Sequence, residues 1–242
     1  IVVDTAHGHT KKVSEVINHI KKFKNKKIAL CAGNIATPEA AKFLLKLGVD
    51  IIKVGIGPGS ICTTRLVAGI GVPQLSAILS VRNGIKNKNI KIIADGGIKY
   101  SGDLAKAFAA GADAVMIGSL FAGTDEAPGK IIKINGKLFK SFRGMGSVGA
   151  MNKGSADRYF QSKQKDSSKY VPEGVEGFSK YKGDVGNIIQ KLTGGLRSSM
   201  GYLGSKQIKY LRNKPQFVKI TKAGVYESMV HNVDIVKSDT KY

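Results

Sequence analysis

The chain has 242 residues, 42% of them hydrophobic, which is enough to bury the core of one domain. No apolar run approaches the roughly 20 residues of a membrane helix and no signal-like segment is present, so we expect a soluble protein without a membrane span. The net charge of +22 comes mostly from scattered lysines without interleaved aromatic residues, which argues against nucleic-acid binding.

Apolar segments alternate with segments of helical period along the first half of the chain. Strands are predicted at residues 1–4, 28–32, 50–54, 90–94 and 114–117. Helices are predicted at residues 13–23, 39–47, 73–82 and 101–110. Thr37 and Pro38 form an N-terminal helix signal before the second helix. This alternation is typical of βαβ units around a parallel sheet.

The unusual residues follow the carboxyl ends of the predicted strands, which favours the (β/α)8 TIM barrel over an open sheet. Only five units are visible, whereas a closed barrel needs eight strands and about 250 residues. We therefore expect residues 1–242 to be a single barrel domain whose first three strands lie upstream of Ile1.

The alternation ends after residue 129. Residues 131–134 and 137–140 flank Asn135-Gly136 and predict a hairpin with a type I′ turn. Residues 144–170 are rich in Gly, Ser and Lys and predict a mobile excursion, so we treat 129–171 as an insert. Further helices are predicted at 185–192 and 205–212, followed by a tail at 213–242 with extended segments at 217–220 and 233–236.

The chain has two cysteines, which excludes a disulfide framework and favours a reducing, cytoplasmic setting. Cys31 is predicted to be a small buried strand residue. Cys62 ends a glycine-rich loop that follows the strand at 50–54, and residue chemistry alone leaves open whether it is a nucleophile or an ordinary loop thiol.

Two further glycine turns follow strands and suit a phosphate group. Gly96-Gly97 and Gly118-Ser119 can bring main-chain N–H groups close to an anion, and Asp95 can accept hydrogen bonds from a ribose diol. Tight turns also need glycine without any ligand. Two such turns together with an aspartate favour a nucleoside monophosphate site.

The segment Lys53-Val-Gly-Ile-Gly-Pro-Gly-Ser-Ile-Cys-Thr-Thr-Arg65 resembles the active-site loop of the inosine monophosphate dehydrogenase/GMP reductase family. The resemblance extends over essentially all 242 residues. It implies a catalytic TIM barrel and a cytoplasmic homotetramer that oxidises inosine 5′-monophosphate to xanthosine 5′-monophosphate with NAD, through a covalent bond to Cys62. It also implies a mobile flap that carries Arg158 and Tyr159.

The resemblance assigns roles to residues of this sequence. The residues implied in catalysis are Cys62, Thr64, Arg158, Tyr159 and Glu173. Those implied in substrate binding are Ser60, Asp95, Gly97, Gly118, Ser119, Met145, Gly146 and Glu173. The NAD side is implied to include Asp4, His7, Asn34, Gly55 and Arg65. A potassium site is implied at the carbonyls of Gly57, Gly59 and Cys62 together with Glu227, Ser228 and Met229 of a neighbouring subunit.

The sequence departs from the family pattern at Phe142, where the family usually has Tyr, and at Phe178 and Met229, where Arg and His are common. GMP reductase is the alternative enzyme, although it lacks the long Arg-Tyr flap. A non-catalytic nucleotide- or nucleic-acid-binding protein is the alternative of another class, but it gives Cys62 and Arg158 no task. The identity of the base that activates water stays open between Arg158 and a path through Thr64 and Glu173.

Overall fold

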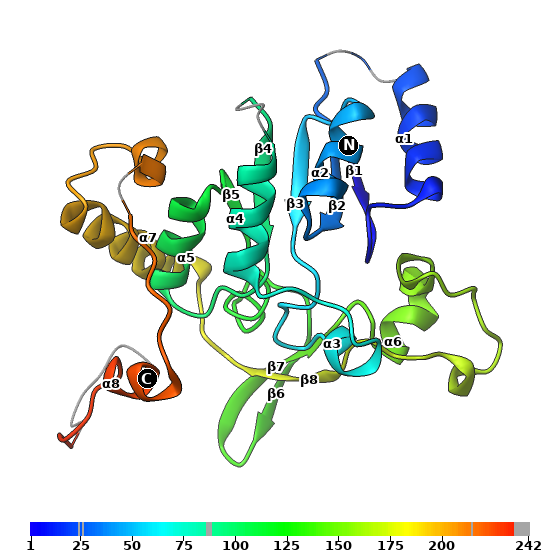
Figure 1. Ribbon diagram of the computed structural model, residues 1–242. Coiled ribbons are helices and arrows are strands. Elements are labelled where there is room, and N and C mark those ends of the chain that lie inside the picture. Colours follow the sequence, from blue (N-terminus) through cyan, green and yellow to red (C-terminus); the bar gives the residue numbers. More distant parts are fainter. Residues whose placement is uncertain (24, 26, 86–88, 214, 235–242) are drawn as a thin grey trace.

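The computed structural model describes residues 1–23, 25, 27–85, 89–213 and 215–234 (Figure 1). Its larger sheet has five parallel strands in the order β1-β2-β3-β4-β5. The strands are β1 (Val2–Asp4), β2 (Cys31–Ile35), β3 (Ile51–Val54), β4 (Lys91–Asp95) and β5 (Ala114–Met116). The helices between them are α1 (Lys11–Phe23), α2 (Pro38–Lys46), α3 (Thr64–Val67), α4 (Gln74–Gly84) and α5 (Ser101–Ala110). The predicted alternation of strands and helices is confirmed.

Local signals in the sequence set the helix ends. The Thr37 side chain accepts a hydrogen bond from the Ala40 N–H, and Pro38 occupies the first helical position of α2. Gly111 ends α5 with φ +116°, where an added Cβ would lie 2.6 Å from Arg82 Cγ. A glycine is therefore needed at this position to turn the chain back toward β5.

The strand predicted at 28–32 is displaced, because β2 runs from Cys31 to Ile35. Its position is set by its partners, since Val2 pairs with Cys31 and Cys31 pairs with Ile51. Both faces of β2 are buried, as is usual for a central parallel strand covered by helices. Cys31 is buried as predicted, and burial raises the pKa of its thiol.

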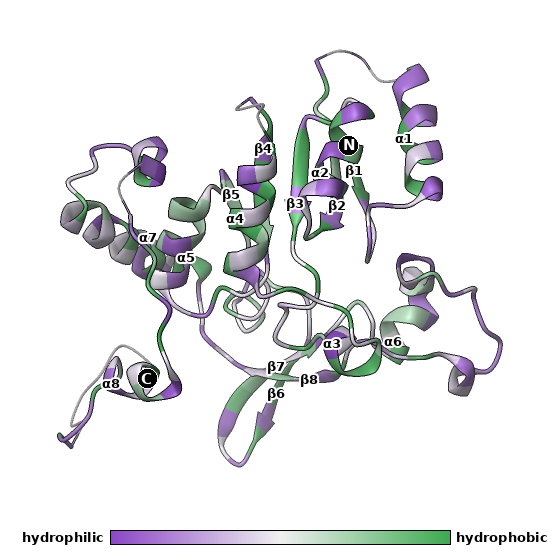
Figure 2. Ribbon diagram, viewed as in Figure 1, coloured by the Kyte–Doolittle hydropathy of each residue, from purple (hydrophilic) through white to green (hydrophobic). Residues whose placement is uncertain are grey.

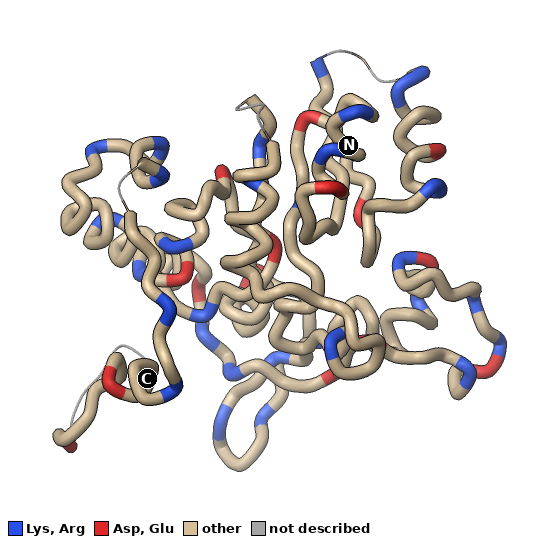
Figure 3. The backbone as a smooth tube through the Cα atoms, viewed as in Figure 1, with Lys and Arg blue, Asp and Glu red and all other residues tan. Residues whose placement is uncertain are grey.

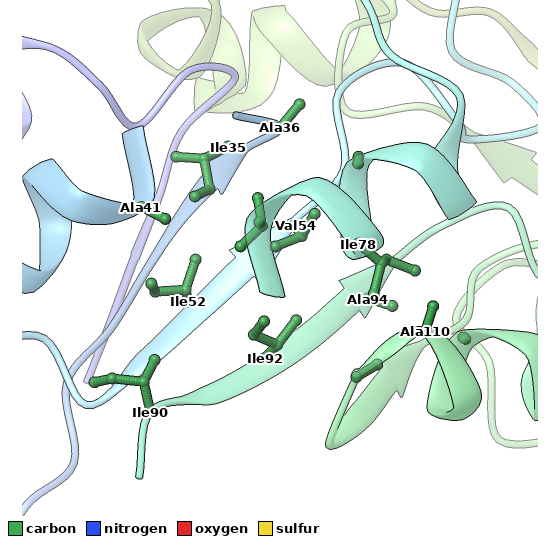
Figure 4. Close-up of a cluster of buried hydrophobic side chains, with 14 of the residues drawn as sticks. Ile35, Ala36, Ala41, Ile52, Val54, Ile78, Ile90, Ile92, Ala94 and Ala110 are labelled. Carbon is green, nitrogen blue, oxygen red and sulfur yellow. The ribbon is translucent and has the colours of Figure 1, made fainter. Parts of the chain in front are cut away.

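The main hydrophobic core lies between the sheet and its helices (Figure 4). Ile52, Val54 and Ile92 from the central strands are fully buried and meet Leu44 of α2 and Ile78 of α4. Figure 2 shows that the ribbon of β3 is mostly hydrophobic, whereas that of α1 is mostly hydrophilic. The core fixes the strands, and therefore fixes where their carboxyl-terminal loops meet.

A second, antiparallel sheet comprises β6 (Ile131–Ile134), β7 (Lys137–Arg143) and β8 (Glu176–Lys180). The predicted hairpin is confirmed, and Asn135 and Gly136 have φ of 48° and 77°, as a type I′ turn requires. The third strand, β8, was not predicted. It pairs with β7 from Phe139 to Arg143 after a long excursion of the chain.

That excursion, residues 144–170, contains α6 (Val148–Ala150) and short turns of π and 3-10 helix. Met151, Ala156 and Tyr170 form a small buried cluster within it. The excursion therefore has a core of its own, which its polar composition did not predict. We call residues 144–171 the flap.

The carboxyl-terminal part adds α7 (Val185–Tyr202), a 3-10 segment (Ile208–Asn213) and α8 (Lys222–Glu227). The helix predicted at 185–192 continues to Tyr202, and the helix predicted at 205–212 is a 3-10 segment; both pack against α5. Residues 217–220, predicted to be extended, belong to no strand or helix of the structure, and α8 was not predicted. Residues 235–236 of the other predicted extended segment lie outside the described residues.

Lys and Arg residues are spread along the backbone in Figure 3 and are not gathered on one element. Among the helices of the described residues, none is both long enough and apolar enough to cross a membrane.

Candidate active site

A cavity of about 340 Å³ lies at the carboxyl ends of the parallel strands. The glycine loop after β3, the turns after β4 and β5, the end of β7 and the flap all contribute to its wall. Most of the predicted site residues line it, namely Asp4, Asn34, Gly55, Gly57, Gly59, Ser60, Cys62, Thr64, Asp95, Gly97, Gly118, Ser119, Met145, Gly146, Arg158, Tyr159 and Glu173. Segments far apart in the sequence thus meet in one cavity.

The Cys62 thiol is the first member of a chain of hydrogen bonds. It donates to Thr64 Oγ1 at 3.2 Å, and the Thr64 hydroxyl donates to Glu173 Oε2 at 2.7 Å. The backbone holds the same groups together, because the Thr63 N–H donates to the Glu173 carbonyl at 2.8 Å. A proton can therefore pass between the sulfur and a carboxylate without bulk water.

Glycine is required where the loop after β3 meets the end of β4. Gly55 has φ +148°, and an added Cβ would lie 2.2 Å from the Asp95 carbonyl oxygen. The loop can approach Asp95 this closely only without a side chain. This contact places the loop that carries Cys62 beside Asp95, the residue predicted to bind the ribose hydroxyls.

Lys53, in the middle of β3, points its ammonium into the cavity. Its side chain is 2% exposed, and its Nζ lies 2.9 Å from Asp4 Oδ1 and also bonds Asp95 Oδ2. Asn34 Nδ2 donates to the same Asp95 oxygen at 2.9 Å and to the Gly55 carbonyl at 2.7 Å. Lys53 was not among the predicted site residues, although a lysine inside an apolar strand was the signal that could have identified it.

The flap is docked on the end of β1. Arg158 Nη1 lies 2.5 Å from Asp4 Oδ1, and the Arg158 carbonyl accepts the Ala6 N–H at 3.0 Å. Burial acts to raise the pKa of Asp4, but Arg158 and Lys53 outweigh it and hold that pKa below the ordinary aspartate value. Burial acts to lower the pKa of Arg158, but Asp4 reverses the effect and raises it. In this arrangement Arg158 is firmly cationic.

Tyr159 lines the cavity beside Arg158. Burial raises the pKa of its phenol, and the adjacent Arg158 only partly offsets this effect. The Ser155 hydroxyl donates to the Met145 carbonyl at 2.5 Å, a bond that joins two parts of the flap. The docked flap therefore presents a cation and a neutral phenol to the cavity.

The remaining predicted residues do not line this cavity. Arg65 donates to the Val72 carbonyl at 2.7 Å, and His7 stacks on His9 with ring centroids 6.5 Å apart. Burial, assisted by His9, lowers the pKa of His7. The residues predicted for a cation site at the end of α8 lie apart from the cysteine loop in Figure 1, namely Glu227, Ser228 and Met229. Their predicted roles stay predictions.

The described part of the chain holds no group of three or more His, Cys, Asp and Glu side chains that could bind a metal ion. Main-chain carbonyl oxygens are a separate class of cation ligand. A cation at this site would therefore have to be bound mainly by backbone oxygens.

Comparison with known proteins gives consistent matches over nearly the whole chain. A family model described as the IMP dehydrogenase / GMP reductase domain matches residues 1–231. Inosine-5′-monophosphate dehydrogenase of Rhizobium tropici is 55% identical over 97% of this chain and 47% of its own length. The protein of the same name from Methanocaldococcus jannaschii is 55% identical over 100% of this chain and 50% of its own length.

A solved structure of a GMP reductase variant from Trypanosoma brucei, in complex with guanosine 5′-monophosphate, superimposes with a TM-score of 0.86 at 45% identity. The match covers 96% of this chain and 47% of that chain. With the parallel order of β1 to β5, it confirms the predicted fold class, because these five units form part of a (β/α)8 barrel. The chain spans about half the length of the curated relatives it matches.

Proposed function

The chain belongs to the IMP dehydrogenase / GMP reductase family, and we propose that it forms the active site of an enzyme that oxidises inosine 5′-monophosphate to xanthosine 5′-monophosphate with NAD. The observation that carries this proposal is the position of Cys62. Its thiol shares one cavity with Asp95 and with the Gly118-Ser119 turn, and it is hydrogen-bonded through Thr64 to Glu173.

The cavity can bind a purine nucleotide in one orientation. Gly97, Gly118, Ser119 and Ser60 supply N–H and O–H donors for the phosphate. Asp95, held by Lys53 and Asn34, accepts hydrogen bonds from the ribose hydroxyls. Met145, Gly146 and Glu173 border the base, and this placement brings its C2 atom to the Cys62 sulfur.

The reaction divides into two steps at Cys62. In the first, the thiol proton passes through Thr64 to Glu173, the sulfur adds to C2, and the C2 hydrogen leaves as hydride. NAD, when bound, supplies the hydride acceptor. In the second, water adds to C2 of the covalent thioimidate and the C2–sulfur bond breaks, which releases xanthosine 5′-monophosphate and restores the thiol.

The residues on the NAD side fit a dinucleotide only when the flap has left. Asn34 Oδ1 is buried and has no hydrogen-bond partner among the described residues, so this wall retains an unused acceptor for a carboxamide. In the docked flap, Arg158 occupies the space beside Asp4. We therefore infer that the nicotinamide and the flap use this space in turn, with Asp4, Asn34 and Gly55 on the wall and with Arg65 and His7 farther out.

A potassium ion suits the cysteine loop, where it would be held by the carbonyls of Gly57, Gly59 and Cys62. The Gly59 carbonyl already accepts the Cys62 N–H at 3.2 Å and has a second lone pair for a cation. Glu227, Ser228 and Met229 would complete the site from a neighbouring subunit of a homotetramer. Their separation from the loop within one chain, and the exposed apolar residues around α8, support this arrangement.

GMP reductase is the second candidate function, and the structural similarity to the Trypanosoma brucei enzyme favours it. The docked flap with Arg158 and Tyr159 favours the dehydrogenase. Only the dehydrogenase must hydrolyse its covalent intermediate, and the flap can bring these side chains into the cavity for that step once hydride transfer is complete.

One assay distinguishes the candidates. The purified protein is supplied with inosine 5′-monophosphate and NAD, or with guanosine 5′-monophosphate and NADPH, each with and without potassium, and NADH or NADPH is followed by absorbance. We expect potassium-dependent NADH formation with the first pair, and its loss in Cys62→Ala. Oxidation of NADPH with the second pair would identify a reductase, and no change with either would contradict both.

A further inference from the structure

Carbonyl groups of the turn that follows β5 and carries Gly118 and Ser119 are bound by a lysine that does not line the cavity. Lys182 lies between β8 and α7, and its Nζ donates to the Ser119 carbonyl at 2.7 Å and to the Leu120 carbonyl at 2.8 Å. The N–H groups of Phe121 and Ala122 both donate to the Gly118 carbonyl at 3.0 Å, which closes the turn. The ammonium therefore binds the two carbonyls that follow.

Lys182 is itself fixed by the backbone around it. Its N–H donates to the Gly123 carbonyl at 2.8 Å, and the Asp125 N–H donates to the Gly183 carbonyl at 3.0 Å. Residues 180–183 thus run along residues 123–125, and an added Cβ on Gly123 would lie 2.0 Å from the Lys180 carbonyl oxygen. This pairing fixes the backbone of Lys182 beside the turn, and the two bonds to the Ser119 and Leu120 carbonyls hold its ammonium there.

A second lysine binds the same segment farther along. Lys140 of β7 is buried, and its Nζ donates to the carbonyls of Thr124 (2.7 Å), Asp125 (3.2 Å) and Ala127. The two ammonium groups together bind five carbonyls between residues 119 and 127. The segment after β5 is therefore bound by two positive charges from residues that do not line the cavity.

The ammonium of Lys182 is bonded to the Ser119 carbonyl, so it lies close to any anion that binds the N–H groups of the Gly118-Ser119 turn. It attracts that anion strongly, because the intervening protein screens charges far less than water does. A phosphate monoester has a second pKa near 6 and is mostly a dianion at neutral pH. We infer that Lys182 is a positioning residue that gives the Gly118-Ser119 turn its affinity for the phosphate dianion. This inference rests on the proposed function, in which this turn binds the phosphate of a purine nucleotide.

The test measures what the phosphate contributes to binding. The dissociation constants of inosine 5′-monophosphate and of inosine are determined for the wild type and for Lys182→Met, which keeps the length of the side chain and removes its charge and donors. We expect the ratio of the inosine constant to the inosine 5′-monophosphate constant to fall about tenfold in Lys182→Met, with inosine binding unchanged. Lys180→Met, at an exposed position two residues earlier, is the matched control and should keep the wild-type ratio.

Two further measurements separate positioning from general support of the fold. Lys182→Arg keeps the charge, and its ratio of inosine to inosine 5′-monophosphate dissociation constants should stay close to that of the wild type. Between pH 5 and 7 the affinity of the wild type for inosine 5′-monophosphate should rise as the phosphate loses its second proton, and in Lys182→Met this rise should be smaller. An unchanged ratio in Lys182→Met, or equal weakening of both ligands, would overturn the inference.

The outcomes also distinguish this inference from the proposed function. A wild-type protein that binds inosine 5′-monophosphate no more tightly than inosine would contradict the nucleotide site itself. A wild-type preference that survives unchanged in Lys182→Met would contradict only the role of Lys182.

Discussion

The substitution Lys53→Met tests whether the charges around the cavity are held by a buried lysine. Methionine fills a similar volume but cannot bind Asp4 and Asp95, so both carboxylates lose their shared cation. Removing one partner of a fully buried ion pair costs about 3–5 kcal/mol. Here Asp4 and Asp95 are 43% and 20% exposed, and they keep Arg158 and Asn34 as partners. We therefore expect the free energy of unfolding to fall by about 2–3 kcal/mol.

Denaturant unfolding of the wild type and Lys53→Met measures this loss. Lys91→Met in the adjacent strand β4 is the control, because Lys91 is 60% exposed and its ion pair with Asp113 spans 3.6 Å, so we expect a change of about 0–1 kcal/mol. Lys53→Met should also raise KM for inosine 5′-monophosphate, since Asp95 loses the group that orients it. If the free energy of unfolding of Lys53→Met fell by less than about 1 kcal/mol, as in the control, this would refute the view that the ion pairs of Lys53 with Asp4 and Asp95 stabilise the fold.

Three further predictions follow from other contacts. Thr64→Val interrupts the path from Cys62 to Glu173, so we expect turnover to fall about 10–100-fold in stopped-flow and steady-state assays, whereas Thr63→Val, whose hydroxyl makes no capping bond, should remain active. Burial acts to raise the pKa of Asp113, but hydrogen bonds from the Ile92 N–H and Arg212 outweigh it and lower that pKa. The contribution of ionised Asp113 to the stability of the folded protein is therefore complete above the ordinary aspartate pKa of about 3.9, and it is lost as the pH falls below that value. The free energy of unfolding in urea should therefore vary less between pH 5 and 2.5 for Asp113→Asn than for the wild type. An equal dependence of this free energy on pH in both proteins would contradict the prediction. Phe142→Tyr adds a hydroxyl to the cavity wall and should lower KM for inosine 5′-monophosphate about 3–10-fold, while an unchanged or higher KM would show that the hydroxyl does not reach the phosphate.

The barrel half of the fold was predictable because its signals are local. Apolar strands, a Thr-Pro helix start and glycine helix ends each lie within a few residues of the feature they determine. The strand β8 was missed because its partner, β7, lies more than thirty residues earlier, and its own sequence, Glu-Gly-Phe-Ser-Lys, has little apolar content. The position of β2 was likewise set by pairing with β1 and β3 rather than by its own composition.

The candidate site divides in the same way. Cys62, Asp95 and the glycine turns were found because each motif is contiguous and follows a strand. Lys53 and Lys182 were missed, because their importance depends on partners 42 and 63 residues away. Sequence periodicity reports which face a residue occupies, but it does not report which distant carboxylate or carbonyl that face will meet.

The ion pair between Arg158 and Asp4 limits which residue can activate water in the proposed hydrolysis. A general base must lose its proton near neutral pH, yet the pairing raises the already high pKa of Arg158. Glu173 is an acceptor by nature and reaches the Cys62 sulfur through a single hydroxyl. For the proposed reaction we therefore infer that the water proton leaves along the Thr64–Glu173 path, and that Arg158 holds the flap and supplies positive charge. If Arg158 were the base, it would first have to separate from Asp4, and Asp4→Asn would then speed hydrolysis rather than slow it.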